Sequence, residues 1–182
     1  MKKLGFTLAE VLITLVIIGV IAAMTVPTLM NNTNAQEFRS ALKKAISSLN
    51  QAIEREYAME GVNVGDFTSA ADLATNLFGK NLQVIDTTQA VQGHSGSNFV
   101  TADGMIFSIT EFTPASCDFE NETSCGTIYI DVNGKKGPNK DTTSSTHPRD
   151  IYKVLLYSQR AIAGDTATQE VMFDKPTTTS ST

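Results

Sequence analysis

The sequence is poor in the side chains on which most enzymes and nucleic-acid-binding proteins depend. It has no tryptophan, two cysteines and two histidines in 182 residues, and 14 basic residues against 19 acidic ones. Two thiols fall short of the four ligands that a structural zinc site takes. The acidic balance, without a long cluster of lysine and arginine, argues against a protein that neutralises phosphates. We therefore expect no nucleic-acid partner.

Recognisable catalytic motifs are also missing. The sequence contains no G-x-S-x-G elbow, no H-E-x-x-H pair, no Walker loop and no Rossmann glycine pattern. His94 and His147 lie in stretches rich in Gly, Ser or Pro, with no catalytic partner that the sequence identifies. We therefore expect neither an enzyme nor a bound cofactor, apart from the calcium considered below.

Charge is nearly absent from one long stretch at the N-terminus. Between Phe6 and Met30 the only charged residue is Glu10, and Lys2 and Lys3 precede this stretch. About 20 helical residues cross a hydrocarbon core of roughly 30 Å, and the two lysines place the N-terminus on the cytoplasmic side. Three fates stay open: a secretory signal cut after the apolar core, an uncut anchor, or a cut after Gly5 that keeps the helix.

Glu10 bears on these alternatives, because a charge in a spanning helix costs a few kcal/mol unless it finds a partner. After a cut at Gly5, the new Phe6 ammonium group would lie four residues from Glu10, about 6 Å along a helix. In a bundle of parallel helices, Glu10 of one subunit could then pair with Phe6 of the next. The alternative is that Glu10 lies among the lipid headgroups and reaches water there.

The stretch "KKLGFTLAEVLITLVIIGVIAA" resembles the class III signal of type IV pilins and type II secretion pseudopilins. That signal has a short basic leader, a Gly, a Phe, the pattern T-L-x-E and a long apolar helix. The resemblance implies cleavage after Gly5 by a prepilin peptidase, N-methylation of Phe6 and an assembly contact at Glu10. It also places Pro27 where pilin helices are commonly kinked, and we expect a kink or local melt there.

The resemblance further implies a structural subunit of a type IV pilus (fimbrium) or a type II secretion filament. Its N-terminus would be cytoplasmic, its single helix would lie in the inner membrane and its head would be extracytoplasmic. An assembly ATPase and platform protein would incorporate it with other pilin or pseudopilin subunits. The signal does not separate major pilin, minor pilin and pseudopilin. The competing hypothesis is a membrane-anchored extracytoplasmic binding module that does not polymerise.

The remaining sequence predicts an α+β fold with a long N-terminal helix, its apolar half exposed and its second half packed on an antiparallel sheet. Residues 1–5 would be the leader, 6–30 the apolar helix, 31–61 an amphipathic helix, 62–164 the head and 165–182 a polar, disordered tail. The amphipathic helix is predicted from apolar residues at steps of three and four, with a stop at Gly61; they are Phe38, Leu42, Ile46, Leu49, Ile53 and Tyr57.

Within the head, residues 69–80 predict a short amphipathic helix with Leu73, Leu77 and Phe78 facing inward. Residues 98–112 predict a hairpin that turns at a glycine, and "GTIYIDV" predicts another strand. The stretch "DIYKVLLYSQ" fits either a last strand or a short helix.

Two constellations in the head suggest sites. Cys117 and Cys125 predict a disulfide if the head is outside the cytoplasm, and free thiols otherwise. Four oxygen-bearing side chains, loosely similar to the calcium loop of major pseudopilins, follow the best strand; they are Asp131, Asn133, Asp141 and Asp150. They lack the acid that an EF-hand has at its twelfth position. The alternative is a turn at Asn133-Gly134 with solvated acids.

Overall fold

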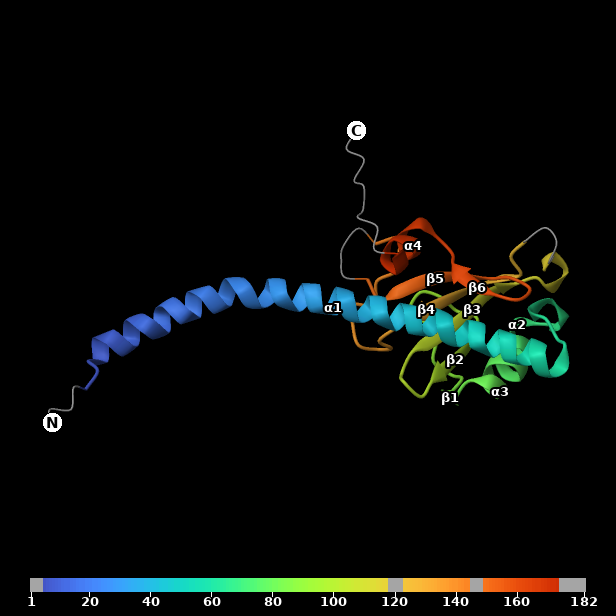
Figure 1. The fold of residues 1–182 in the computed structure, drawn as a ribbon, viewed down its shortest axis with the longest axis horizontal. Coiled ribbons are helices and arrows are strands. Elements are labelled where there is room, and N and C mark those ends of the chain that lie inside the picture. The colour runs from blue at the N-terminus through green and yellow to red at the C-terminus, as the bar shows by residue number, and fades with distance from the viewer. Residues whose placement is uncertain (1–4, 118–122, 145–148, 174–182) are drawn as a thin grey trace, which may run out of the picture. The chain divides into compact units, whose positions relative to one another are not determined.

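The computed structural model describes residues 5–117, 123–144 and 149–173. The chain forms two compact units, Met1–Gln36 and Glu37–Thr182. Helix α1, Leu8–Glu60, contributes its first part to one unit and its second part to the other. The class is α+β, as predicted: a long helix with an apolar first half is followed by short helices and a six-stranded antiparallel sheet (Figure 1).

The first unit consists of the apolar part of α1 and the residues before it. Leu8–Pro27 is the one described helical segment that is long and apolar enough to cross a membrane, and none of it is buried. The predicted local melt at Pro27 is wrong, because the backbone is helical on both sides of this residue. The predicted start at Phe6 is also two residues early, since α1 begins at Leu8.

In the second unit, which we call the head, α1 buries the stripe that the sequence predicted. The members of this stripe are at most 6% exposed and belong to the main core; they are Phe38, Leu42, Ile46, Leu49 and Ile53. Tyr57, the last member of the predicted stripe, is 48% exposed, so the core ends one turn earlier. Gly61 ends the helix as predicted, with a φ of 71° and its N–H donated to the Tyr57 carbonyl.

The sheet has its strands in sequence order, and every neighbouring pair is antiparallel. The predicted hairpin and the strand after it are confirmed, and the ambiguous stretch near residue 151 is a strand. The strands are β1 (Val84–Asp86), β2 (Ser97–Thr101), β3 (Ile106–Phe112), β4 (Gly126–Asp131), β5 (Ile151–Leu156) and β6 (Ala161–Ala163). The β2–β3 turn contains Gly104 at a φ of 86°.

Alternation along the strands gives the sheet two apolar faces. One face packs against the head part of α1, where Phe99 and Phe107 stack with ring centroids 4.7 Å apart (Figure 1). The other face carries a smaller cluster, in which Val100, Ile106 and Ile151 pack against Val91 of the β1–β2 connection. Gly96 lets this connection close onto β3, because a Cβ there would lie 2.0 Å from the Ile109 carbonyl oxygen.

Short helical segments complete the head. Residues 70–81 form three consecutive helical segments, and Leu73, Leu77 and Phe78 are fully buried, as predicted. The segments are α2 (Ala70–Asp72), the π-helix η2 (Leu73–Phe78) and α3 (Gly79–Asn81). A further helix, α4 (Thr166–Phe173), contradicts the predicted disorder of 165–182 over these residues; 174–182 lie outside the described part. Val171 and Met172 pack against the main core, which accounts for this helix.

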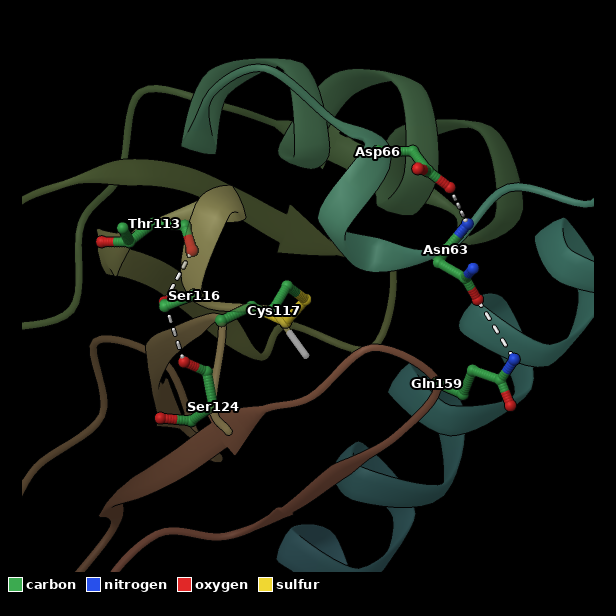
Figure 2. The surroundings of a disulfide bond; sticks show 8 residues. Asn63, Asp66, Thr113, Ser116, Cys117, Ser124 and Gln159 are labelled. Atoms are coloured by element: carbon green, nitrogen blue, oxygen red, sulfur yellow. Dashed lines mark hydrogen bonds between the residues drawn. A yellow bond between two sulfur atoms is a disulfide. The ribbon is translucent and has the colours of Figure 1, made fainter. Parts of the chain in front are cut away.

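The predicted disulfide is present between Cys117 and Cys125, whose Cα atoms are 4.4 Å apart (Figure 2). Cys117 follows the 3-10 turn η3 (Pro114–Ser116). There the Ser116 hydroxyl donates hydrogen bonds to the carbonyl oxygens of Thr113 and Ser124. The disulfide packs against the 3-10 turn η1 (Val64–Asp66), because a Cβ on Gly65 would lie 2.8 Å from the Cys117 Cβ. Closing a loop this short contributes about 2–3 kcal/mol in the chain-entropy account.

Candidate functional site

The described chain begins with an exposed, non-helical segment that runs into α1. Gly5, Phe6 and Thr7 have no helical backbone and are exposed, and the Phe6 side chain is 84% exposed. A Cβ on Gly5 would meet no atom within 4 Å. An exposed, irregular segment of this kind is open to a peptidase, so the predicted cut between Gly5 and Phe6 falls at an accessible peptide bond.

Thr7 and Glu10 form a reciprocal capping box at the start of α1. The Glu10 backbone N–H donates to the Thr7 hydroxyl oxygen at 3.3 Å, and the Thr7 N–H donates to the Glu10 carboxylate at 3.4 Å. The carboxylate also lies at the positive end of the helix dipole. Glu10 therefore has a partner within its own chain, which the sequence-based interpretation had not identified.

The helical surface after this cap is apolar on every side. The side chains of Leu8 and of the large apolar residues from Val11 to Met30 are 46–81% exposed. Soluble proteins do not leave an apolar surface of this size in water. This helix therefore needs a lipid or protein environment.

The loop between β4 and β5 brings together two of the four predicted calcium ligands. Asp131 and Asp150 are 2% and 0% exposed, so the prediction that the acids are solvated is wrong for both. Asp150 accepts the N–H groups of Asn139 and Lys140 at 2.8 and 2.7 Å, and Asp131 accepts that of Asn133 at 3.2 Å. Burial and the nearby Asp150 carboxylate raise the pKa of Asp131 to about 7.

The predicted turn at Asn133-Gly134 is present, and Gly134 has a φ of 67°. Asp141, the fourth predicted ligand, accepts bonds from the backbone and hydroxyl of Thr143 and pairs with His94. Over 5–117, 123–144 and 149–173, no three acidic, histidine or cysteine side chains are grouped so that they could hold a metal ion. Calcium binding in this loop stays a prediction.

His94 has partners that the sequence did not reveal. Its ring stacks on Tyr129 of β4 with centroids 3.5 Å apart, and its Nε2 lies 3.4 Å from the Asp141 carboxylate. Burial opposes ionisation of Asp141, but the bonds from Thr143 and His94 outweigh it and lower the Asp141 pKa. These contacts join the β1–β2 connection to the β4–β5 loop. The other histidine, His147, lies outside the described residues.

A second polar cluster joins the end of α1 to α3. Glu56, which the helical periodicity placed off the apolar stripe, is only 5% exposed. Its carboxylate accepts the Asn81 amide at 2.7 Å and lies 3.3 Å from Lys80 Nζ, which also contacts Glu60 at 2.5 Å. The periodicity of one helix could not reveal this cluster, since the partners come from a later segment.

The head also has a pocket between α1 and the β2–β3 turn. Phe107 and Met105 contribute apolar side chains to its lining, and the Lys44–Asp103 ion pair, at 2.8 Å, also lines it. The Thr101 hydroxyl also lines this pocket and donates a hydrogen bond to the Asp103 carboxylate.

Comparison with protein families gives one match, the prokaryotic N-terminal methylation motif, over residues 1–26. Neither the curated proteins nor the solved structures give a match. The motif implies processing by a prepilin peptidase and assembly with other pilin subunits, and it points to a structural protein. With the exposed apolar helix, it also fits membrane anchoring. The match covers 26 of the 182 residues, and it supports a class III signal peptide and a likeness to type IV pilins at the N-terminus.

Proposed function

We propose that this protein is a structural subunit of a type IV pilus or a type II secretion filament. The prepilin enters the inner membrane, is cut after Gly5 and methylated at Phe6, and then polymerises through α1. The observation that supports this most is the combination of the methylation motif with a helix, Leu8–Pro27, none of which is buried in its own chain.

The physical setting of this helix explains why assembly needs machinery. In the bilayer the helix is already surrounded by lipid, so the hydrophobic effect does not by itself favour contact between helices. Leaving the membrane is favourable only when packing among neighbouring helices replaces the lipid contacts. We propose that an assembly ATPase and its platform protein drive this exchange.

The orientation follows from charge and redox chemistry. Lys2 and Lys3 favour a cytoplasmic N-terminus, which places the head on the other side of the membrane. The Cys117–Cys125 disulfide supports this orientation, because disulfides persist in oxidising compartments outside the cytoplasm.

The first experiment determines the N-terminal sequence and mass of the protein from native membranes and from the sheared cell surface. A methylated Phe6 at the start of both fractions is the expected result. An intact leader on the membrane form would instead favour a displayed binding module that does not polymerise. A start near Met24 would indicate a secreted protein and would exclude the filament.

The role of Glu10 is tested by two substitutions that separate charge from capping. Glu10→Val removes both, whereas Glu10→Gln keeps a side-chain oxygen that can accept the Thr7 N–H. We expect both variants to be inserted and cut, but to yield at least tenfold fewer sheared filaments, because each lacks the charge that pairs with the neighbouring Phe6 ammonium. Normal assembly of Glu10→Gln would assign Glu10 to helix capping alone.

A further inference from the structure

The head carries a basic cluster where α1 enters it. Between Phe38 and Lys44, α1 has three bases and no acid, and Lys43 and Lys44 are exposed. Lys44 pairs with Asp103 in the β2–β3 turn. The next residue of that turn, Gly104, meets the β4–β5 loop, because a Cβ on Gly134 would lie 2.6 Å from the Gly104 carbonyl oxygen. The proximal basic cluster consists of Lys43, Lys44, Lys135 and Lys136.

The opposite end of the same helix is acidic. Residues 54–72 contain five acids and one base, Arg55. Lys80 reaches this end from α3 and is shared between Glu56 and Glu60. The hydrogen bond and charge of Lys80 lower the pKa of Glu60. The distal acidic cluster consists of Glu54, Glu60, Asp66 and Asp72; the first three are exposed and Asp72 is half-buried.

The two clusters are fixed at a distance that prevents them from neutralising each other within one head. Sixteen helical residues separate Lys44 from Glu60, which corresponds to about 24 Å. This exceeds the Debye length of about 8 Å at physiological ionic strength. Asp103 offsets Lys44 and Lys80 offsets Glu60, and the remaining charge of each cluster is presented to other molecules.

We propose that the proximal basic cluster of one subunit docks on the distal acidic cluster of a neighbouring copy of this chain. This inference rests on the proposed function, because a filament that repeats one subunit along its axis gives every head the same polarity. A translation along that direction brings a proximal end toward a distal end, where opposite charges attract. Antiparallel contacts would bring like charges together and are disfavoured, so the heads reinforce the parallel order.

Two charge substitutions of equal size test the proposal in cells that assemble the filament. Lys135→Gln with Lys136→Gln neutralises two exposed lysines of the proximal cluster. The control variant, Thr87→Glu with Ala90→Glu, changes the net charge by the same amount. Its two positions are exposed and belong to neither cluster. We expect at least a tenfold loss of sheared filaments for the first variant and no loss for the second. Equal yields from the two would overturn the proposal.

A charge exchange tests whether the two clusters meet. Lys135→Glu with Lys136→Glu should abolish assembly, and adding Glu54→Lys with Glu60→Lys should restore at least part of it. Failure of this restoration, in heads whose thermal unfolding is unchanged, would contradict the pairing. If the wild-type chain itself starts at Met1 and gives no filaments, the proposed function fails. If wild-type filaments form but the filament yield does not depend on the two clusters, only this inference is refuted.

Engineered cysteines give a readout that does not depend on filament yield. The two native cysteines are bonded to each other, so new thiols can be followed separately. Glu54→Cys combined with Lys136→Cys should give ladders of cross-linked subunits after mild oxidation. The control pair, Thr87→Cys with Lys136→Cys, should give at most dimers. Ladders from both pairs, or from neither, would count against the docking.

Discussion

Asp131 is the residue at which burial and charge conflict most strongly in the head. It is 2% exposed, and the Asp150 carboxylate lies close to it. Within residues 5–117, 123–144 and 149–173, the Asp131 carboxylate accepts backbone N–H groups and lies 3.2 Å from the Asn139 side-chain amide, and no ion pair forms with it. A carboxyl group in such a site is better accommodated with its proton, which agrees with its pKa of about 7.

This pKa predicts how the stability of the head depends on pH. Because the folded pKa lies above the ordinary value of 3.8, the folded chain retains a proton that the unfolded chain releases between pH 3.8 and about 7. The free energy of unfolding therefore falls as the pH rises through this window.

We expect Asp131→Asn to remove this dependence. It should raise the free energy of unfolding at pH 8 by about 1 kcal/mol, a value below the full shift because water and salt screen part of the repulsion. It should have little effect near pH 4. Thermal unfolding of the full chain in detergent at both pH values measures the difference. An equal effect at the two pH values would show that titration of Asp131 does not contribute.

At the scale of single elements, the main question is what joins α1 to the rest of the head. Its apolar stripe packs on the sheet, and two polar contacts join the helix to β6 and α3. The Asn50 side chain accepts the Ala161 N–H at 2.7 Å and donates to the Ala161 carbonyl at 3.1 Å, so it satisfies the outer edge of β6. The Glu56 carboxylate accepts a hydrogen bond from the side-chain amide of Asn81 in α3.

The Glu56 contact gives a prediction at this scale. Glu56→Ala should destabilise the head by about 2–3 kcal/mol, because it leaves the Asn81 amide without its charged acceptor. Glu54→Ala, two residues earlier on the exposed side of the same helix, should change the free energy of unfolding by less than about 0.5 kcal/mol. Urea unfolding of the detergent-solubilised chain compares them. Equal effects would mean that the buried cluster adds no stability.

At the scale of the whole molecule, the chain combines two units with opposite solvent requirements. Met1–Gln36 presents an apolar helix with no core of its own, whereas Glu37–Thr182 contains the described sheet and both apolar clusters. The head therefore has the parts that an independently folding domain needs.

We predict that residues 37–182 alone form a soluble domain with cooperative thermal unfolding. A shorter chain that starts at Ile46 loses Phe38, Leu42 and Ala45, which are at most 6% exposed. We expect this control to unfold at least 10 °C lower, because deleting buried apolar side chains costs about 2–5 kcal/mol each. Circular dichroism on both fragments measures the difference. Aggregation of the 37–182 fragment would indicate that its fold depends on the N-terminal unit.

Local patterns were sufficient to predict much of this architecture. The apolar run, the stripe on α1, the glycine stop at Gly61 and the Gly104 turn each follow from neighbouring residues. The patterns failed where the decisive contact came from elsewhere in the chain. Tyr57 fits the period but lies beyond the sheet, and α4 is helical because Val171 and Met172 find the core.

The sequence by itself determined the long apolar helix, the N-terminal methylation motif and the α+β class, because these depend on composition and short-range order. Only the tertiary structure decided the environment of the charged residues. It buried Asp131 and Asp150 together, and it placed His94 against the Tyr129 ring and the Asp141 carboxylate. Such contacts join segments far apart in the chain, and local sequence patterns do not encode them.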